Sequence, residues 1–315
     1  MLDTKLQKKI EESLQEINFP VAITDIPTIP PSMCRKLVRT DNGQPLGLIK
    51  SRYKPINHMD AFGGALKSMA EGGLDLSEAD ISVKSYEFGA MAKMEVIMPN
   101  LTETIGTHEH QLKYIARNSY NGLWKFQSFF GWLNTVCFNT QVSGQQLAYS
   151  SSKHTHLFDI DASNKKIYTA VEAVKGEAQS YKDWWYTKVE DDQVADMFQK
   201  TICKKKPSNI AKYISEDTEL NKKRLSQLMD LYTKEKVQIH GSGDYTSNPS
   251  KVQGSLWCAF QASTYWSTHV EKTMSKKEYK AHIIQRDRQE CVRKMLNSAS
   301  WKSLETGFVP DQVVA

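Results

Sequence analysis

Residues 108–142 read HEHQLKYIARNSYNGLWKFQSFFGWLNTVCFNTQV, and aromatic residues are denser here than anywhere else in the chain. Alternation around Leu112–Ala116 is typical of a strand, and Asn118–Gly122 supplies the turn to the next one. Basic residues lie between the aromatic ones, and no carboxylate follows Glu109 within the stretch. This combination suits bases stacking along a charged backbone, and it equally suits an ordinary β core. The aromatic residues are Tyr114, Tyr120, Trp124, Phe126, Phe129, Phe130, Trp132 and Phe138.

The whole chain sets wider limits on the class of protein. Its 315 residues can bury one large core or two modest ones. No apolar run approaches the roughly 20 residues that span a bilayer, so we expect no membrane segment. The five cysteines lie far apart and never form a CxxC pair, which predicts reduced thiols in a cytoplasm. They are Cys34, Cys137, Cys203, Cys258 and Cys291.

The first 35 residues predict a helix followed by a connector. Residues 4–18 place Leu6, Ile10, Leu14 and Ile17 on one stripe, which predicts an amphipathic helix of about four turns. The helix would dock on its own body or on a neighbouring subunit, and its spacing favours the first. Residues 20–31 contain four prolines, which predicts an extended connector.

Residues 36–150 predict an antiparallel core of the α+β class. A turn at Asp41–Gln44 and another at Phe88–Gly89 each join two strands, and a helix lies between the two hairpins. The aromatic stretch adds two more strands, with residues from Phe129 onward open to a helical interpretation. We therefore expect one antiparallel sheet that carries a helix. The expected elements are strands at 37–40, 46–49, 81–86 and 91–98, and a helix at 59–71.

Residues 151–315 predict a mostly helical half with a basic end. Apolar residues at helical spacing place helices at 167–179, 181–200, 217–234 and 251–271. Residues 272–302 contain nine Lys or Arg against three acids, a net charge of +6 in a chain of net charge +5. Such a segment is an electrostatic footprint for polyanions, or else a solvated helix face with internal ion pairs. The sequence thus predicts three parts, 1–35, 36–150 and 151–315.

Two His-x-His pairs are the weak candidates for a metal site. Side chains at i and i+2 of a strand share a face, and Asp159 and Asp161 offer carboxylates at the same spacing. No HExxH signature is present, and nothing brings the two pairs together. Since GxSxG, GxGxxG and GxxxxGK[ST] are also absent, we expect no catalytic centre, cofactor or metal. The four histidines are His108, His110, His154 and His156.

Four groups of short motifs follow one another along the chain. They are LGLI, RYKPI and AF at 46–49, 52–56 and 61–62; NSYNG and CFNT at 118–122 and 137–140; HT at 154–155; and WCAFQASTYWSTH at 257–269. In order and spacing they resemble the phage/plasmid-like protein family called domain of unknown function 932. The resemblance spans roughly residues 36–300. This chain departs from the family at Asn121, Gln261 and Tyr265, where Asp, Asn and Glu are usual.

The resemblance implies an association with phages and mobile elements rather than a particular reaction. The three departures remove polar or acidic groups that are usual in the family, and an enzyme is therefore a less favoured interpretation. The expected layout, a small sheet with a helix and a basic helical tail, is similar to that of phage single-strand annealing recombinases at the level of fold alone. Because the motifs NSYNG and CFNT mark this stretch, the resemblance also implies that Phe126, Phe129, Trp132 and Phe138 are core residues.

We therefore expect a phage-encoded protein that binds single-stranded DNA and promotes annealing in recombination or replication, in the host cytoplasm. Annealing needs no nucleotide hydrolysis, which fits the missing P-loop motif. We expect a homo-oligomer, a ring or filament that aligns bases, with a phage exonuclease or a host replication protein as a candidate partner. The expected nucleic-acid contacts are Lys113, Arg117, Tyr120, Trp124, Lys125, Lys276, Lys277, Arg286, Arg288, Arg293 and Lys294.

Two other functions stay open. The first is a protein-binding effector that counters host defence without catalysis, for which tight capture of one host protein without DNA affinity would be the sign. The second is a metal-dependent nuclease that uses the four histidines with Asp159 and Asp161. It would require cleavage that appears only with an added divalent metal.

Overall fold

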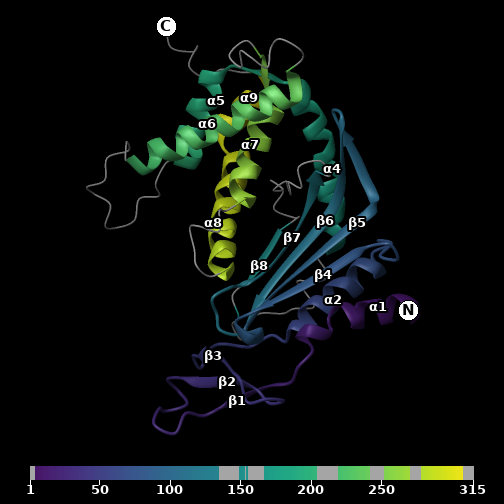
Figure 1. Cartoon of the computed structure of the whole chain (residues 1–315), viewed down its shortest axis with the longest axis vertical. Coiled ribbons are helices and arrows are strands. Elements are labelled where there is room, and N and C mark those ends of the chain that lie inside the picture. Colours follow the sequence, from purple (N-terminus) through teal and green to yellow (C-terminus); the bar gives the residue numbers. More distant parts are fainter. Residues whose placement is uncertain are drawn as a thin grey trace. The chain divides into compact units, whose positions relative to one another are not determined.

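The structure is a computed structural model, and it describes residues 4–134, 149–152, 154, 167–203, 219–241, 252–269 and 278–307. Contacts divide the chain into two compact units. The first unit contains residues 1–103, 110–132 and 145–175, and the second contains 104–109, 133–144 and 176–315. The N-terminal helix and the sheets thus belong mainly to one unit, and the later helices to the other (Figure 1).

The N-terminal helix α1 (Thr4–Ser13) packs on its own chain. Ile10, Leu14 and Ile17 are buried, and the helix contacts α2 (His58–Glu71) and the first strand of the larger sheet. The Lys9 ammonium also donates to the carbonyl oxygen of Ser77 at 2.8 Å. Docking on its own body is therefore confirmed, because the apolar stripe is already covered.

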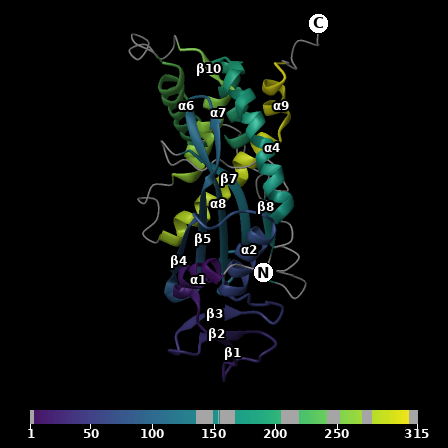
Figure 2. The same ribbon diagram turned by 90° about the vertical axis from the view of Figure 1, so that its right-hand side faces the viewer.

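A three-stranded antiparallel sheet follows α1, with strand order β1-β2-β3 (Figure 2). The hairpin predicted around Asp41–Gln44 is confirmed as β2 and β3. The predicted connector at residues 20–31 also contains a strand, because Val21–Thr24 pair with β2 despite the surrounding prolines. The bounds are β1 Val21–Thr24, β2 Arg35–Arg39 and β3 Pro45–Ile49.

The larger sheet has five strands in the order β4-β5-β6-β7-β8. The hairpin of β4 and β5 is confirmed, with Tyr86 opposite Met91 and the turn at Glu87–Gly89. Residues 36–134 therefore contribute to two sheets instead of the single sheet expected. The bounds are β4 Asp80–Tyr86, β5 Met91–Ile105, β6 His108–Ser119, β7 Phe126–Asn134 and β8 Tyr149–Ser152.

The helical interpretation from Phe129 onward is wrong for residues 129–134, which belong to β7, and the residues that follow lie outside the described part of the chain until Tyr149. Every residue of β7 is buried, so its sequence FQSFFGWLN shows none of the alternation that marks a half-exposed strand. Phe126, Phe129 and Trp132 are core residues, as expected, whereas Phe138 lies outside the described residues. The Trp132 indole donates to the carbonyl oxygen of Val174 at 3.1 Å, which fixes the start of α4 (Ile167–Tyr186) on β7.

The second unit is built of helices. Its core is aromatic, with ring centroids 5.0 to 5.5 Å apart between Tyr181, Trp257 and Phe260. The break predicted near residue 180 falls instead at 187–190, where Glu190 and Gln193 form a capping box. The other elements are β9 Lys188–Val189, α5 Asp191–Phe198, a π-helical turn Gln199–Cys203, α6 Glu219–His240, β10 Gly254–Ser255, α7 Leu256–Thr268, α8 Glu278–Leu296 and α9 Ala299–Glu305.

The α+β class is confirmed: antiparallel sheets come first and helices follow. Within the described ranges, no helix combines the length and the apolar character needed to cross a bilayer.

Candidate functional site

Three segments far apart in sequence meet around one cavity in the first unit. Its volume is about 510 Å³. The segments are the end of β3 with the loop after it, the turn between β6 and β7, and His154. They coincide with three of the four motif groups, whereas the fourth forms α7 in the other unit. The lining residues are Leu48, Ile49, Lys50, Arg52, Tyr53, Asn121, Gly122, Trp124, Lys125 and His154.

Tyr53 is held rigidly in the wall of this cavity. Its hydroxyl donates to the carbonyl oxygen of Ser119 at 2.7 Å, and burial raises the pKa of the phenol above its ordinary value. Its ring stacks on the His154 imidazole, with centroids 5.2 Å apart and planes 4° from parallel. The Lys54 N–H donates to the carbonyl oxygen of His154 at 3.2 Å, which ties His154 to the same loop. The two rings therefore form one fixed aromatic wall.

The turn at 118–122 is closed by its own side chains. The Ser119 hydroxyl donates to the carbonyl oxygen of Trp124 at 2.8 Å and accepts from the Trp124 N–H at 3.1 Å. The side-chain oxygen Oδ1 of Asn121 accepts from the Leu123 N–H at 3.0 Å, an Asx turn. Since that oxygen is engaged, Asn121 offers the cavity mainly its NH₂ donors. Asn at this position thus serves the fold of the turn and adds donors to the cavity.

Close packing of β3 on this turn requires glycine at position 47. A Cβ there would lie 2.8 Å from the Cα of Asn121, a backbone atom that cannot swing aside. We expect Gly47→Ala to lower the free energy of unfolding by about 1–3 kcal/mol through overpacking. Urea denaturation measures it, with Gly176→Ala as the control, because no atom lies within 4 Å of a Cβ there. Equal stability of Gly47→Ala and wild type would contradict this packing.

Beneath the turn, His58 and Asn118 form a buried polar pair. The Asn118 amide nitrogen lies 2.9 Å from the carbonyl oxygen of Ile56 and 2.9 Å from His58 Nδ1. His58 Nε2 lies 3.0 Å from the carbonyl oxygen of Gly89. An amide nitrogen only donates and a carbonyl only accepts, so Nδ1 is bare and Nε2 carries the proton. The pair thus fixes His58 as the neutral Nε2–H tautomer and joins three segments.

Both site histidines make the protein sensitive to acid. Burial lowers the pKa of His58 and of His154 to about 4. Below pH of about 6.5 the unfolded chain protonates both rings while the folded chain does not. The free energy of unfolding therefore falls between pH of about 6.5 and 4, by up to about 3 kcal/mol for each ring.

The measurement is urea denaturation at pH 7.5, 5.5 and 4.5. We expect His58→Gln to be less stable at pH 7.5, because its partners lose their acceptor and donor. It should also lose stability less steeply than wild type as the pH falls. Parallel pH profiles for the variant and wild type would show that His58 is not a buried neutral base.

The cavity is electropositive. Lys50, Arg52 and Lys125 line it and are exposed, and among the described residues none of them pairs with a carboxylate. The described lining contains no Asp or Glu. Residues 35–54 carry six Lys or Arg against Asp41 alone, a net charge of +5. Four side chains with hydrogen-bond donors, these three cations and Asn121, thus line the cavity together with aromatic and apolar residues. This lining suits an anion attached to a flat ring.

The structure places the five predicted sheet contacts in different environments. Lys125 is exposed at the cavity, and Trp124 lines it but is 1% exposed. Tyr120 is buried, where its hydroxyl accepts from the His58 N–H at 3.2 Å. Lys113 and Arg117 are buried as well.

The side chains of Lys113 and Arg117 make their contacts within the larger sheet. The Lys113 ammonium lies 3.1 Å from a carboxylate oxygen of Glu95, which also pairs with Lys93. Burial raises the pKa of Glu95, but the two ammonium charges outweigh burial and hold this pKa at about 2. The Arg117 guanidinium lies 6.0 Å from the centre of the Phe129 ring.

The predicted C-terminal contacts are mostly engaged within their own unit. Arg288 donates to the carbonyl oxygen of Trp266 at 2.7 Å and lies over its ring at 4.6 Å. Arg293 and Lys294 both pair with Glu290, at 2.7 and 3.2 Å. Arg286 pairs with Asp287 at 2.7 Å. Lys276 and Lys277 lie outside the described residues.

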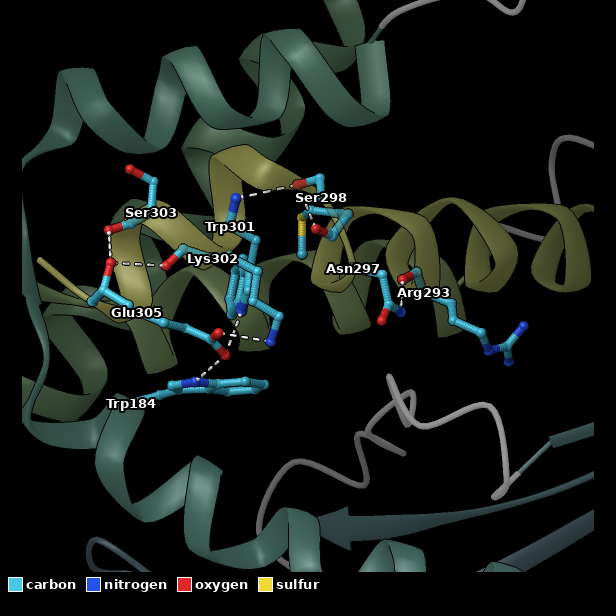
Figure 3. Close-up of polar contacts among 10 residues, drawn as sticks. Trp184, Arg293, Asn297, Ser298, Trp301, Lys302, Ser303 and Glu305 are labelled. Carbon is cyan, nitrogen blue, oxygen red and sulfur yellow. Dashed lines mark hydrogen bonds and ion pairs between the residues drawn. The ribbon is translucent and has the colours of Figure 1, made fainter. Parts of the chain in front are cut away.

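The last helix shows the same use of charge. Figure 3 shows the Trp184 and Trp301 indoles both directed at the Glu305 carboxylate, at 2.9 and 3.1 Å. The Lys302 ammonium lies 2.7 Å from the other oxygen of Glu305. Several charges of the basic C-terminal segment are therefore paired within α8 and α9, and Arg288 joins α8 to α7.

The four candidate metal ligands do not form one described site. His108 lies 3.3 Å from Asn134, His110 is fully buried, and His154 stacks in the cavity wall. His156 lies outside the described residues. Across the described part of the chain, no three His, Cys, Asp or Glu residues are grouped as a metal site would require.

Sequence reasoning missed Lys50, Arg52 and Tyr53 as site residues. Two signals pointed to them. The RYKPI motif contains two of the three, and residues 35–54 have the excess of basic residues described above.

A scan of family models gives one match, and its extent agrees with the motifs around the cavity. The searches of curated proteins and of solved structures each return no match. The matching model covers residues 45–289, about three quarters of the chain. The chain therefore belongs to the family described as Domain of unknown function (DUF932).

Proposed function

We propose that the chain binds single-stranded DNA, with one nucleotide in the cavity of the first unit. The observation that carries this proposal is that cations without a carboxylate partner line the same cavity as a fixed aromatic wall. Lys50, Arg52 and Lys125 have no carboxylate partner among the described residues, so they are available to a phosphate. The Tyr53–His154 stack and Leu48 give a base an apolar surface to lie on.

The size of the cavity supports one nucleotide at a time. Its volume of about 510 Å³ falls within the range of about 300–1,000 Å³ that is common for ligand sites. The described lining offers many donors and few acceptors, as a phosphate requires. A stacked duplex presents neither an isolated base nor a free base face to such a cavity, so a single strand fits better.

Annealing in phage recombination or replication is the process we propose for this binding. An annealing protein holds a strand by its backbone and leaves the bases accessible to the complementary strand. It needs no hydrolysis, so the proposal involves no catalytic residue. A homo-oligomer, with a phage exonuclease or host replication protein as partner, belongs to the same proposal.

Fluorescence anisotropy with a labelled 20-nucleotide DNA tests the proposal. We expect binding at 50 mM salt, weaker binding at 200 mM, and weaker binding of the matching duplex. Mixing with the complementary strand should then accelerate annealing over the protein-free rate. Failure of the wild type to bind the single strand at 50 mM salt would overturn the proposal. If the protein bound the strand without accelerating annealing, the proposed binding site would stand and the proposed role in annealing would be wrong.

A further inference from the structure

The turn between β4 and β5 has an unfavourable backbone. Glu87 and Phe88 both have positive φ, 49° and 61°, and Gly89 follows at 94°. Left-handed conformations cost residues other than glycine roughly 1–2 kcal/mol each, which is why Asn-Gly is common in such turns. A chain selected for stability alone would not place Glu and Phe here.

The turn is nevertheless held firmly. The carbonyl oxygen of Gly89 accepts from His58 Nε2 at 3.0 Å, and the carbonyl oxygen of Ala90 accepts from the Tyr120 N–H at 2.7 Å. A Cβ at position 89 would lie 2.6 Å from the Phe19 ring, so only glycine fits there. Both hydrogen bonds come from residues beneath the cavity. His58 also bonds Asn118, and Tyr120 belongs to the same turn as Gly122.

The turn held in this way exposes the aromatic ring of Phe88 to solvent. The Phe88 side chain is 72% exposed, so it contributes little to the core. Its turn contacts β3, the strand that ends at the cavity, and the Arg39 guanidinium would lie 3.6 Å from a Cβ at Gly89. Figure 1 shows the β4–β5 end of the larger sheet beside β3. A strained turn that exposes a ring beside a strand leading to a cavity is typical of a contact site.

We propose that Phe88 is a second base-stacking residue, which takes a nucleotide next to the one in the cavity. This inference rests on the proposed function. A base is favoured over an apolar protein surface because the turn contacts β3, and the residues just after β3 include the cavity cations Lys50 and Arg52. Leu48 is a further exposed apolar residue on β3. Single-strand binders combine exposed rings with phosphate-binding cations in this way.

Three variants of Phe88 separate stacking from folding. Because stacking on one aromatic side chain contributes about 1–3 kcal/mol, Phe88→Ala should raise the Kd for the 20-nucleotide DNA by about 5- to 100-fold. Phe88→Trp should keep the affinity, and its indole fluorescence should fall on binding. Phe88→Gly should unfold at a higher urea concentration than wild type, because glycine tolerates the positive φ, and yet bind as weakly as Phe88→Ala.

Tyr186→Ala is the matched control, since Tyr186 is a 79% exposed aromatic residue in the other unit. It should bind like wild type. Wild-type affinity of both Phe88→Ala and Phe88→Gly would overturn this inference and leave the proposed function standing. A wild-type protein that does not bind the oligonucleotide would overturn both.

Discussion

Replacing Lys50, Arg52 and Lys125 together with alanine is expected to weaken single-stranded DNA binding by about 100-fold at 50 mM salt. These cations are exposed around one cavity and have no carboxylate partner among the described residues. Each lost phosphate contact costs about 1 kcal/mol, and each 1.4 kcal/mol is a factor of ten in Kd. Anisotropy titrations of the triple variant and wild type measure the ratio.

The salt dependence gives an independent reading of the same variant. Three phosphate contacts on a single strand account for a slope of about −2 in log K against log salt. We therefore expect the variant to lose that part of the wild-type slope. The control is Lys8→Ala, Lys67→Ala and Lys222→Ala combined, which removes the same charge from exposed residues that pair with nearby acids. If both triple variants lose affinity equally, general charge and not the cavity binds the strand.

Asn118→Ala is expected to lower the free energy of unfolding by about 3 kcal/mol. The substitution leaves the carbonyl oxygen of Ile56 and Nδ1 of His58 without their donor, and both residues are buried. A buried polar group without its partner costs about 1–3 kcal/mol. Because His58 also holds Gly89, we expect the β4–β5 turn to loosen as well. Urea denaturation at pH 7.5 measures the loss.

Asn100→Ala is the matched control for this loss. Asn100 donates to the carbonyl oxygen of Asp75 at 3.2 Å, but it is exposed, so water replaces the lost bond. We expect its effect to stay within about 0.5 kcal/mol. A loss at Asn118 no larger than that at Asn100 would mean that the His58 network does not support the site.

The hairpins could be predicted from sequence because their alternation is visible. In β5, Met94, Val96 and Met98 are fully buried, and the residues between them are half-buried. In β7 both faces are buried, so the pattern vanishes and a helix fits the same residues. Register and partner strands depend on contacts distant in sequence, which is why two sheets were not distinguished from one.

Of the residues that line the cavity, only Trp124 and Lys125 were predicted from the sequence as nucleic-acid contacts. The motif residues Tyr53, Ser119 and His154 meet in space, and their sequence order gave no sign of it. Lys113 and Arg117 look like surface cations in sequence, but burial places them within the sheet. Whether a Lys faces solvent or a Glu on a neighbouring strand depends on which strands pair, and single-strand patterns do not contain that information.

Photocrosslinking of an oligonucleotide with 5-iodouracil at every second position, followed by mass spectrometry of the peptides, tests the central claim most directly. The account predicts crosslinks in the peptides that contain Tyr53 and Trp124, with a further one at Phe88. It also predicts that Lys50→Ala, Arg52→Ala and Lys125→Ala combined remove them. Crosslinks confined to the peptides of α8, around Arg286 and Arg293, would contradict it and place the strand on the C-terminal basic segment.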